Sequence, residues 1–500
     1  MLLLSAVAFL LQLSLSSCSS SKFIVNPETH RILDTEGRTR FFHGTNVVYK
    51  TAPFVPDTSS FDAKESFSVE DADLLASMGY NSIRLGVLWA GYEPTMGEYN
   101  ETYLDIVEEI VNMAGERGIY SLLDMHQDVF NRKFCGNGVP DWAAIHDENN
   151  FPVPLAEEYE TDENIYPGRV DCDSIPWPNY HFTYALEQSV GRLYQNYDGL
   201  LDRFVEFWGK VAERFSENEY ILGYEIMNEP WCGNTYEEPE LLIPGVADNR
   251  YLQPMYDAVN DRIREHDQTH LIFFESVTWE IAGIGETYGF AHPPGGDDFK
   301  NRSVLSFHNS VLPEVTPDDK YYDLRAKEIK RLGIAGFVTE TNNDRNQLDL
   351  MDDLVRWGYS WHHWAYKWYG NVTWDNNGLF LTENTYDKCS GSMDECLDIE
   401  KVKTYARIYP QTIAGEVKYF HYAADSREAI FIYKPDTRIP GNTILAVPEW
   451  NYENGYTVTI FPSLVNWKKG CCTLALNATI ELEVNSEWTN EEISVILTPA

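Results

Sequence analysis

Residues 221 to 230 read ILGYEIMNEP, a nearly unbroken apolar run that closes on Asn228, Glu229 and Pro230. Near-continuous apolar runs are typical of parallel strands that are buried on both faces. Because proline cannot extend strand pairing, the strand is expected to end here. This stretch therefore predicts a strand of a parallel sheet that presents Glu229 at its carboxyl end.

Seven other runs of this kind occur along the chain, and amphipathic helical segments separate them. They are FFHGTNVVY (41 to 49), NSIRLGVLW (81 to 89), YSLLDMHQDV (120 to 129), HLIFFES (270 to 276), SVLSFHN (303 to 309), GIAGFVTET (333 to 341) and YSWHHWAYK (359 to 367). Strands that alternate with helices in this way predict a (β/α)8 TIM barrel of the α/β class. Ser68 and Asp71 resemble a capping box at the start of the first helix, and Gly79 is expected to end it.

Two regions depart from the alternation. Residues 130 to 198 form a long insertion after the third strand, and an insertion at this place lies at the catalytic end of a barrel. Beyond about residue 415, runs such as EAIFIYKP, TILAVP, YTVTIFP and ISVILTP predict a small C-terminal β-sandwich. We expect a signal peptide at 1–20, a catalytic domain at 21–412 and the sandwich domain at 415–500.

The barrel is expected to bring two glutamates together at its mouth. Glu229 follows the fourth strand, and Glu340 ends the seventh. Carboxyl groups about 5 Å apart allow one to attack the anomeric carbon while the other protonates the leaving oxygen, which retains the configuration, whereas about 6.5 to 9.5 Å leaves room for water and inverts it. We predict a retaining β-glycosidase with Glu340 as nucleophile and Glu229 as general acid/base. The nearby anion is expected to raise the pKa of Glu229.

Each of these signals also has a purely structural interpretation. An isolated Asn-Glu-Pro triplet recurs by chance, and its glutamate can simply cap the next helix. Arg84, on the second strand, can hold Glu340 ionised or can pair with another strand-end carboxylate. His126 and Asp128, at the end of the third strand, can bind sugar hydroxyls, although a histidine bonded to backbone is the alternative. Trp364 can stack on a sugar or belong to the core. Their order along the strands favours one converging site.

The amino terminus and the composition favour a secreted or lumenal protein. Residues 1 to 21 form an apolar run followed by small residues, as in a signal peptide, although no basic residue precedes the run. Four sequons, at Asn100, Asn301, Asn371 and Asn477, agree with export. The net charge of −40 argues against nucleic acid and against electrostatic docking to anionic lipid.

The 8 cysteines are compatible with an oxidising compartment. With Cys18 removed in the signal peptide, an odd number remains, so one thiol would stay free. Cys135 with Cys172 and Cys389 with Cys396 are plausible local pairs, although several connectivities are possible. The sequence has no Cys-x-x-Cys or His-Glu-x-x-His zinc pattern, and the glutamate chemistry needs no metal, so we expect neither a metal nor another cofactor.

Taken together, the motifs resemble glycoside hydrolase family five, and within it the endoglycoceramidases. The resemblance spans roughly residues 41 to 367, and its more specific motifs are GTNVVYK (44 to 50), DMHQDVF with GNGVPDWA (124 to 143), EIMNEPW (225 to 231) and FVTETN (337 to 342). The β-rich tail is similar to the C-terminal domain of that subgroup. The resemblance implies hydrolysis of the β-linkage between oligosaccharide and ceramide, and hence a glycosphingolipid substrate and transient contact with a membrane or micelle surface.

The resemblance also implies roles for individual residues. Glu229 falls on the acid/base position and Glu340 on the nucleophile, and the substrate-binding candidates are Lys50, Arg84, His126, Asp128, Asn228, His308 and Trp364. Lys50 could otherwise be a solvated loop lysine. The sequence departs from the family after the sixth strand, where a tyrosine often lies near the nucleophile and FHNSV offers His308 and Asn309 instead.

The same pair of glutamates is also compatible with other functions. An endo-β-glucanase or mannanase would use it on a polysaccharide, and a glucosylceramidase-like enzyme would use it on a shorter glycolipid. A carbohydrate-binding protein on an inactive barrel would lack at least one of the two glutamates, and both are present.

Overall fold

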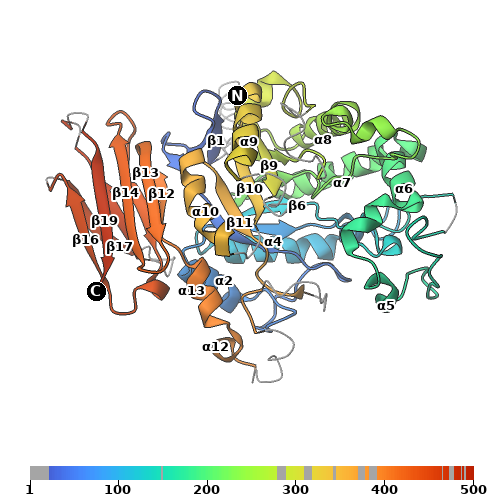
Figure 1. The fold of residues 1–500 in the computed structure, drawn as a ribbon, viewed down its shortest axis with the longest axis horizontal. Coiled ribbons are helices and arrows are strands. Elements are labelled where there is room, and N and C mark those ends of the chain that lie inside the picture. The colour runs from blue at the N-terminus through green and yellow to red at the C-terminus, as the bar shows by residue number, and fades with distance from the viewer. Residues whose placement is uncertain are drawn as a thin grey trace, which may run out of the picture.

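The computed structural model describes residues 22–147, 150–278, 289–308, 318–341, 345–369, 378–381, 391–463, 465–471, 478–485, 487–488 and 491–500. Figure 1 shows a barrel with its helices and, to the left of it, a β-rich domain. The predicted signal peptide, Asn309, Asn371, Cys389 and Asn477 lie outside the described residues.

Eight parallel strands close into a barrel in their order along the chain, as predicted. They are β4 (His43–Val47), β5 (Ser82–Gly86), β6 (Tyr120–Asp124), β7 (Ile221–Glu225), β8 (Leu271–Phe274), β9 (Ser303–His308), β10 (Ala335–Thr341) and β11 (Ser360–His363). Each strand lies within its predicted apolar run, and nearly every strand residue is buried. Because the strands are parallel, their carboxyl ends meet at one mouth, where the polar residues that follow the apolar runs are gathered.

Helices surround the barrel and separate its strands. The helices of the barrel layer are α2 (Val69–Ser77), α3 (Trp89–Tyr92), α4 (Glu101–Gly115), α7 (Leu200–Phe215), α8 (Gln253–Arg264), α9 (Asp318–Leu332) and α10 (Arg345–Trp357). The predicted capping box is present, since the backbone N–H of Ser68 donates to the Asp71 carboxylate over 2.6 Å. Gly79 follows α2 with φ +85°, a conformation that glycine adopts without a Cβ clash. None of the described helices is both long and apolar enough to cross a membrane.

The predicted insertion follows β6 and is built mostly of short turns. It contains α5 (Arg169–Cys172) and α6 (Tyr184–Tyr194). Cys135 and Cys172 form a disulfide, as one of the predicted pairs requires. Cys232 is a free, buried thiol. The disulfide ties the middle of the insertion to the loop that leaves β6, at the mouth of the barrel.

Replacing both Cys135 and Cys172 with serine should destabilise the insertion. The two cysteines are 37 residues apart, and loop-closure entropy gives about 4 kcal/mol for a crosslink of that span. Calorimetry of the double variant should show a lower Tm than that of the wild type, and trypsin should cut between the two positions sooner. An unchanged Tm together with an unchanged cleavage rate would contradict this expectation.

The C-terminal domain consists of two antiparallel sheets. One sheet has the order β13-β14-β19-β16, and the other has the order β1-β2-β3-β12-β15-β18-β17. The bounds of the C-terminal strands are β12 (Tyr409–Ile413), β13 (Gly415–Ala423), β14 (Glu428–Pro435), β15 (Thr443–Val447), β16 (Tyr456–Phe461), β17 (Asn466–Cys471), β18 (Ala478–Glu483) and β19 (Ile493–Pro499). Before this domain come α12 (Met393–Cys396) and α13 (Ile399–Tyr405). The β-rich C-terminal domain was predicted, and all four of the quoted sequence runs form strands.

The first strands of the chain belong to the larger of these two sheets. β1 (Phe23–Asn26), β2 (Arg31–Asp34) and β3 (Thr39–Arg40) lie in the range predicted as catalytic domain, yet β3 pairs with β12. On their other side, Phe23, Val25 and Ile32 pack in one apolar cluster with barrel residues that include Phe42 and Phe337. These amino-terminal strands therefore join the barrel to the C-terminal domain.

Candidate active site

Glu229 and Glu340 face each other at the mouth of the barrel. One carboxylate oxygen of each, together with a ring nitrogen of His308, lies within 4.8 Å of the other two atoms. The side chains of Glu229 and Glu340 are 13% and 12% exposed, so both reach the surface of the site while remaining largely dry. This separation is the one at which a carboxylate attacks the anomeric carbon directly, without an intervening water.

The backbone around Glu229 is held in an unusual conformation. Glu229 has φ +41°, which is costly for a residue with a side chain. The Gln127 side-chain amide donates to the carbonyl oxygens of Asn228 (2.7 Å) and Glu229 (3.0 Å). The Asn228 amide donates in return to the Gln127 carbonyl over 2.9 Å. These bonds between the ends of β6 and β7 fix the turn that aims Glu229 into the mouth.

Arg84 lies beneath the two glutamates and is fully buried. Its guanidinium contacts Glu340 (2.6 Å), Glu225 (2.5 Å) and the Asn228 side-chain oxygen (2.7 Å). It also lies 3.0 Å from an Asp124 carboxylate oxygen. The predicted pairing with Glu340 is therefore present. Because Arg84 has no exposed surface, it acts on a substrate through Glu340 and Asn228, and we assign it as a positioning residue.

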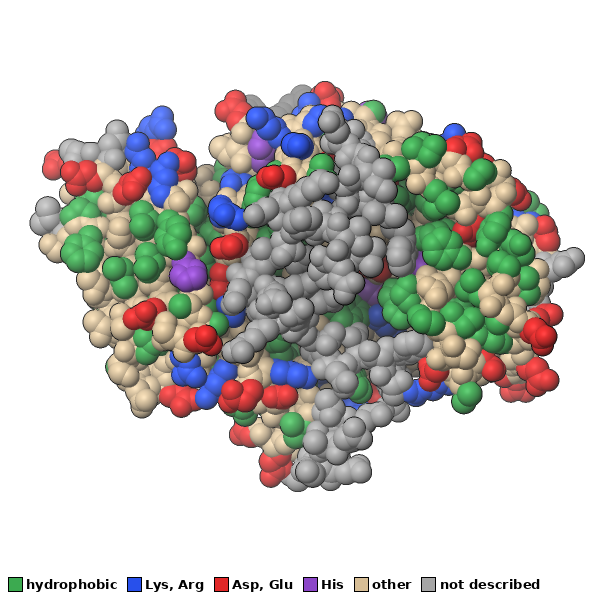
Figure 2. All heavy atoms as spheres, in the orientation of Figure 1, with side chains coloured by type: hydrophobic (Ala, Val, Ile, Leu, Met, Phe, Trp, Pro, Cys, Tyr) green, Lys and Arg blue, Asp and Glu red, His purple; other side chains and the backbone are tan. Residues whose placement is uncertain are grey.

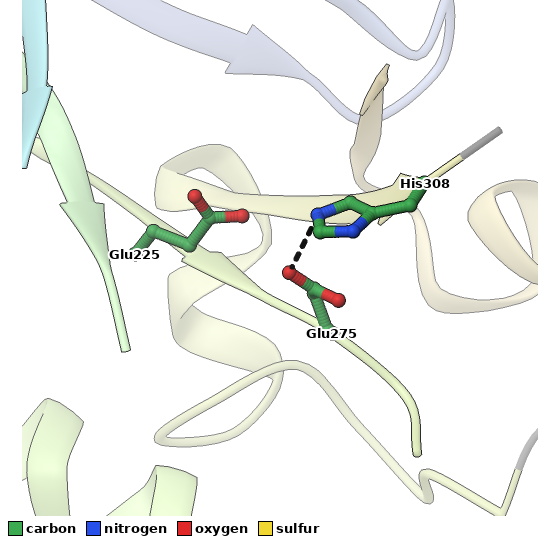
Figure 3. Close-up of side chains that lie close together, drawn as sticks. All are labelled: Glu225, Glu275 and His308. Atoms are coloured by element: carbon green, nitrogen blue, oxygen red, sulfur yellow. Dashed lines mark ion pairs between the residues drawn. The ribbon is translucent and has the colours of Figure 1, made fainter. Parts of the chain in front are cut away.

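His308 links the catalytic pair to a third glutamate. Its Nδ1 lies 2.8 Å from Glu229 and 3.7 Å from Glu340, and its Nε2 lies 3.1 Å from Glu275. Figure 3 shows the His308 ring facing Glu225, with the Glu275 carboxylate below them and in contact with the ring. Burial disfavours the charged ring, but the surrounding carboxylates outweigh burial and raise the pKa of His308 well above its usual value. The contacts of His308 with Glu229, Glu275 and Glu340 therefore favour the charged form of the imidazole.

The charge on His308 corrects the predicted pKa of Glu229. Burial favours the neutral acid, but the hydrogen bond and the charge of His308 outweigh it, and the pKa of Glu229 is lowered rather than raised. Burial raises the pKa of Glu340, while His308 and Arg84 oppose that shift. The predicted rise followed from the second carboxylate alone, without the charge of His308. The pKa shifts of His308 and Glu229 together favour the proton on His308, one hydrogen bond away from Glu229.

Replacing His308 with glutamine should shift the acidic limb of the kcat/KM profile to higher pH. The nucleophile must be ionised, and the cationic ring now lowers the pKa of Glu340 across 3.7 Å. Removing an opposite charge at this distance raises a carboxyl pKa by about one unit or more. The acidic limb should therefore move upward by about one pH unit. A profile measured on an aryl β-glycoside checks this, and an acidic limb that stays in place would contradict it.

Four predicted substrate-binding residues form a continuous wall beside the pair. Lys50 Nζ lies 2.7 Å from the Asp128 carboxylate and 4.1 Å from the centre of the Trp364 ring. The His126 ring stacks on Trp364 with centroids 5.4 Å apart. His126 Nδ1 lies 2.8 Å from Asp124, and Nε2 lies 3.4 Å from Asp128. Both ring nitrogens of His126 thus face carboxylates rather than backbone. Lys50 is not a solvated loop residue, because its ammonium group contacts Asp128 and Trp364. An aromatic face beside alternating charges suits a sugar ring and its hydroxyls.

Several residues of the site were not among the predicted site residues, although Asn46, Asp124, Gln127 and Glu225 lie within the quoted motifs. Glu225 and Glu275 are two of them; their position near strand ends was the available signal, and the sequence analysis did not select them. Gln127, Asp124 and Asn46 belong to the same set. The Asn46 side-chain oxygen accepts from Arg84 over 3.0 Å. All of them lie at the carboxyl ends of β4 to β8, where barrel closure brings them to one place.

Two groups of side chains have the donor set of a cation site, namely Glu225, Glu275 and His308, and Glu229, His308 and Glu340. The second group contains one oxygen of each glutamate of the candidate catalytic pair. A cation bound there would compete with the His308 proton for the same carboxylates.

Comparison with known proteins agrees with this geometry. The family model described as cellulase (glycosyl hydrolase family 5) matches residues 51–379, and the model of the family 5 C-terminal domain matches residues 407–489. The chain belongs to glycosyl hydrolase family 5. Within family 5 it is similar to the endoglycoceramidase of Cyanea nozakii, with 39% identity over 93% of this chain and 92% of the relative. It is also similar to the endoglycoceramidase of Hydra vulgaris, with 42% identity over 89% of this chain and 85% of the relative.

Solved structures of the family share the fold of both domains. Endo-glycoceramidase II from Rhodococcus sp., in a structure described as a lactosyl-enzyme intermediate, aligns with a TM-score of 0.68 and 20% identity over 94% of this chain and 99% of that one. A crystal structure of an endogalactoceramidase aligns with a TM-score of 0.64 and 18% identity over 96% of this chain and 100% of that one. The family 5 barrel and its C-terminal β domain thus match the predicted fold class. This family 5 member is a glycoside hydrolase of the endoglycoceramidase group.

Proposed function

We propose that this glycoside hydrolase cleaves the β-glycosidic bond between the oligosaccharide and the ceramide of glycosphingolipids, and that it retains the anomeric configuration. The observation that carries this proposal is the Glu229–Glu340 pair, whose oxygens lie within 4.8 Å, in a chain that is 39–42% identical to endoglycoceramidases. An inverting enzyme would need a wider gap for water.

The reaction takes place in two steps. Glu340, held by Arg84 over 2.6 Å, attacks the anomeric carbon, while Glu229 gives a proton to the leaving ceramide oxygen. The glycan is then bonded to Glu340 as an ester. In the second step Glu229 takes a proton from water, which attacks the same carbon and releases Glu340. His308, 2.8 Å from Glu229, passes its proton to Glu229 before the first step, and the proton that Glu229 takes from water in the second step restores the starting state.

Exposed apolar side chains support a transient contact with a membrane or micelle. On the face in Figure 2, apolar side chains gather over the part of the molecule where Figure 1 places α5 and α6. The exposed large apolar residues in the described part of the insertion are Leu155, Ile165, Val170, Tyr184 and Tyr197. Apolar surface of this kind suits a lipid interface better than water. A secreted or lumenal location fits the disulfide and the exposed sequon at Asn100.

The products released from three substrates test the proposal. The purified protein is incubated with a ganglioside, with glucosylceramide and with carboxymethylcellulose. We expect an intact oligosaccharide and free ceramide from the ganglioside. Glucose from glucosylceramide alone, or loss of viscosity of the cellulose derivative alone, would instead support the glucosylceramidase or the endoglucanase. NMR of the first sugar released should show the β-anomer, and an initial α-anomer would contradict retention.

A further inference from the structure

A cavity of about 480 Å³ adjoins the wall of the active site and lies outside the catalytic pair. This volume falls in the range of sites for small ligands. Lys50 and Asn137 line the cavity and also contact Asp128, through the Lys50 ammonium at 2.7 Å and the Asn137 amide at 2.8 Å. The cavity therefore begins where the proposed sugar-binding wall ends.

The position of the cavity places it on the glycan side of the scissile bond. Its lining comes from the loops that follow β4, β5 and β6 and from the insertion. Glu229, which protonates the leaving ceramide oxygen, follows β7, and its partners Glu275 and His308 come from β8 and β9. A glycan that passes over Lys50 and Trp364 thus extends toward the cavity as it leaves the catalytic pair.

Arginine side chains give the cavity a cationic wall, although the chain as a whole has a net charge of −40. Arg132 and Arg169 line it together with Lys50. The Arg132 guanidinium lies over the Tyr166 ring at 4.4 Å, and among the described side chains no carboxylate pairs with it. Arg169 pairs with Asp173 at 3.6 Å in an exposed, weak contact. A guanidinium stacked on an aromatic ring keeps its edge available for an anion.

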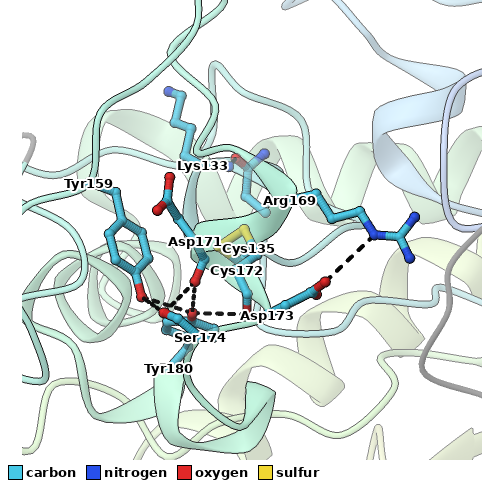
Figure 4. The surroundings of a disulfide bond; sticks show 10 residues. Lys133, Cys135, Tyr159, Arg169, Asp171, Cys172, Asp173, Ser174 and Tyr180 are labelled. Carbon is cyan, nitrogen blue, oxygen red and sulfur yellow. Dashed lines mark hydrogen bonds and ion pairs between the residues drawn. A yellow bond between two sulfur atoms is a disulfide. The ribbon is translucent and has the colours of Figure 1, made fainter.

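The carboxylates of the cavity are already bonded. Asp141 accepts hydrogen bonds from the Tyr166 hydroxyl and from the Asn131 amide. Asp173 pairs with Arg169, and Figure 4 shows this pair on the side of α5 that faces away from Tyr159 and Tyr180. Among the charged groups of the wall, Arg132 is thus the one best placed to receive a new anionic partner.

The disulfide holds the two arginines in place relative to each other. Arg132 lies three residues before Cys135, and Arg169 lies three residues before Cys172. The Cys135–Cys172 bond therefore joins the two turns that carry the guanidinium groups. The contact of Arg132 with Tyr166, from the insertion, ties the same two segments together a second time. A site for a charged ligand gains affinity when its donors are fixed beforehand.

We propose that this cavity binds an anionic substituent of the glycan, the carboxylate of an acidic sugar or a sulfate ester, with Arg132 as its principal ligand and Arg169 as a second donor. The planar guanidinium can bind either group through two parallel hydrogen bonds. This inference rests on the proposed function, because the glycan must enter with its ceramide end at Glu229. Such a site makes the enzyme bind acidic glycans more tightly than neutral glycans that have the same core.

Calorimetric titration of soluble oligosaccharides into the Glu340→Gln variant tests the proposal without turnover. Sialyllactose and lactose 3′-sulfate are compared with lactose, and the same titrations are repeated with Arg132→Gln added. We expect at least one acidic sugar to bind about tenfold more tightly than lactose, as one charge-assisted contact would give. Arg132→Gln should remove that preference and leave the affinity for lactose unchanged. The two acidic sugars distinguish a carboxylate from a sulfate ligand.

Arg438→Gln is the matched control. Arg438 is an exposed arginine of the C-terminal domain, paired with Asp436 at 2.7 Å, and its replacement should leave the preference intact. Equal affinity of the parent for all three sugars would overturn the proposal, as would an Arg132→Gln variant that loses lactose and acidic sugars alike. Cleavage of neutral lactosylceramide is scored separately. If that lipid is cleaved while no acidic preference is found, the cavity proposal fails and the proposed function stands.

Discussion

Replacement of Glu340 by glutamine should lower kcat/KM for a glycosphingolipid by about 10⁴-fold or more. An amide is nearly the same size as a carboxylate but cannot attack the anomeric carbon, so the covalent step is lost. The change also removes the ion pair with Arg84 at 2.6 Å. Arg84 keeps Glu225 and Asp124 as partners, and we therefore expect the variant to fold.

Hydrolysis of glycolipid and of an aryl β-glycoside, followed together with the Tm, measures this effect. Glu400→Gln is a suitable control, because Glu400 is an exposed glutamate of α13 and is not one of the active-site residues described above. The control should retain wild-type rates. A Glu340→Gln variant that folds and turns over at rates near those of the wild type would show that Glu340 is not the nucleophile.

Replacement of Glu229 by glutamine should separate two classes of substrate. With a glycolipid the leaving oxygen is a poor leaving group and needs a proton, so the rate should fall by about 10³-fold. An aryl glycoside with a nitrophenolate leaving group needs little protonation and should lose much less in the first step. Both rates are measured with the same enzyme preparation. The ratio of the loss on the glycolipid to the loss on the aryl glycoside shows how strongly the defect depends on the leaving group.

Glu340→Gln provides the comparison for this second variant, since loss of the nucleophile should slow both substrates alike. Equal losses on glycolipid and aryl glycoside in Glu229→Gln would contradict the role of Glu229 as the acid. The expected result is a large fall in kcat/KM for the glycolipid and a small one for the aryl glycoside, whose kcat is limited by the second step, in which Glu229 no longer takes the proton from water.

The barrel was predictable from sequence because its strands are buried on both faces, and burial leaves long apolar runs such as ILGYEIMNEP. The amino-terminal strands were not predicted. FIVN at 23–26 and RILD at 31–34 are short and alternate in burial, and the partner of β3 lies at the other end of the sequence. Pairing over that distance leaves no local signal.

The position of Glu229 and Glu340 at one mouth of the barrel was predictable for a related reason, since each lies at or just beyond the end of a strand within a motif. The electrostatics of Glu229 were not. The pKa of Glu229 depends on His308, which comes from β9 and reaches Glu229, Glu275 and Glu340 only when the barrel has closed. The sequence indicates which residues lie at the carboxyl ends of the strands. It does not indicate that the charge of His308 will lie next to Glu229 and Glu340.

The sheet that contains β1–β3 also sets an order of events during synthesis. Arg40 leaves the ribosome early, yet its strand partner Thr412 follows only about 370 residues later. At ~5–20 residues per second this is a delay of roughly 20 to 70 s. In the finished fold the apolar residues of β1 and β2 pack on the barrel floor, through Phe42 and Phe337. Because Phe337 and the last barrel strand, β11, are themselves synthesised about 300 residues or more after Arg40, the amino-terminal strands lack both their sheet partner and part of the barrel floor for most of that interval.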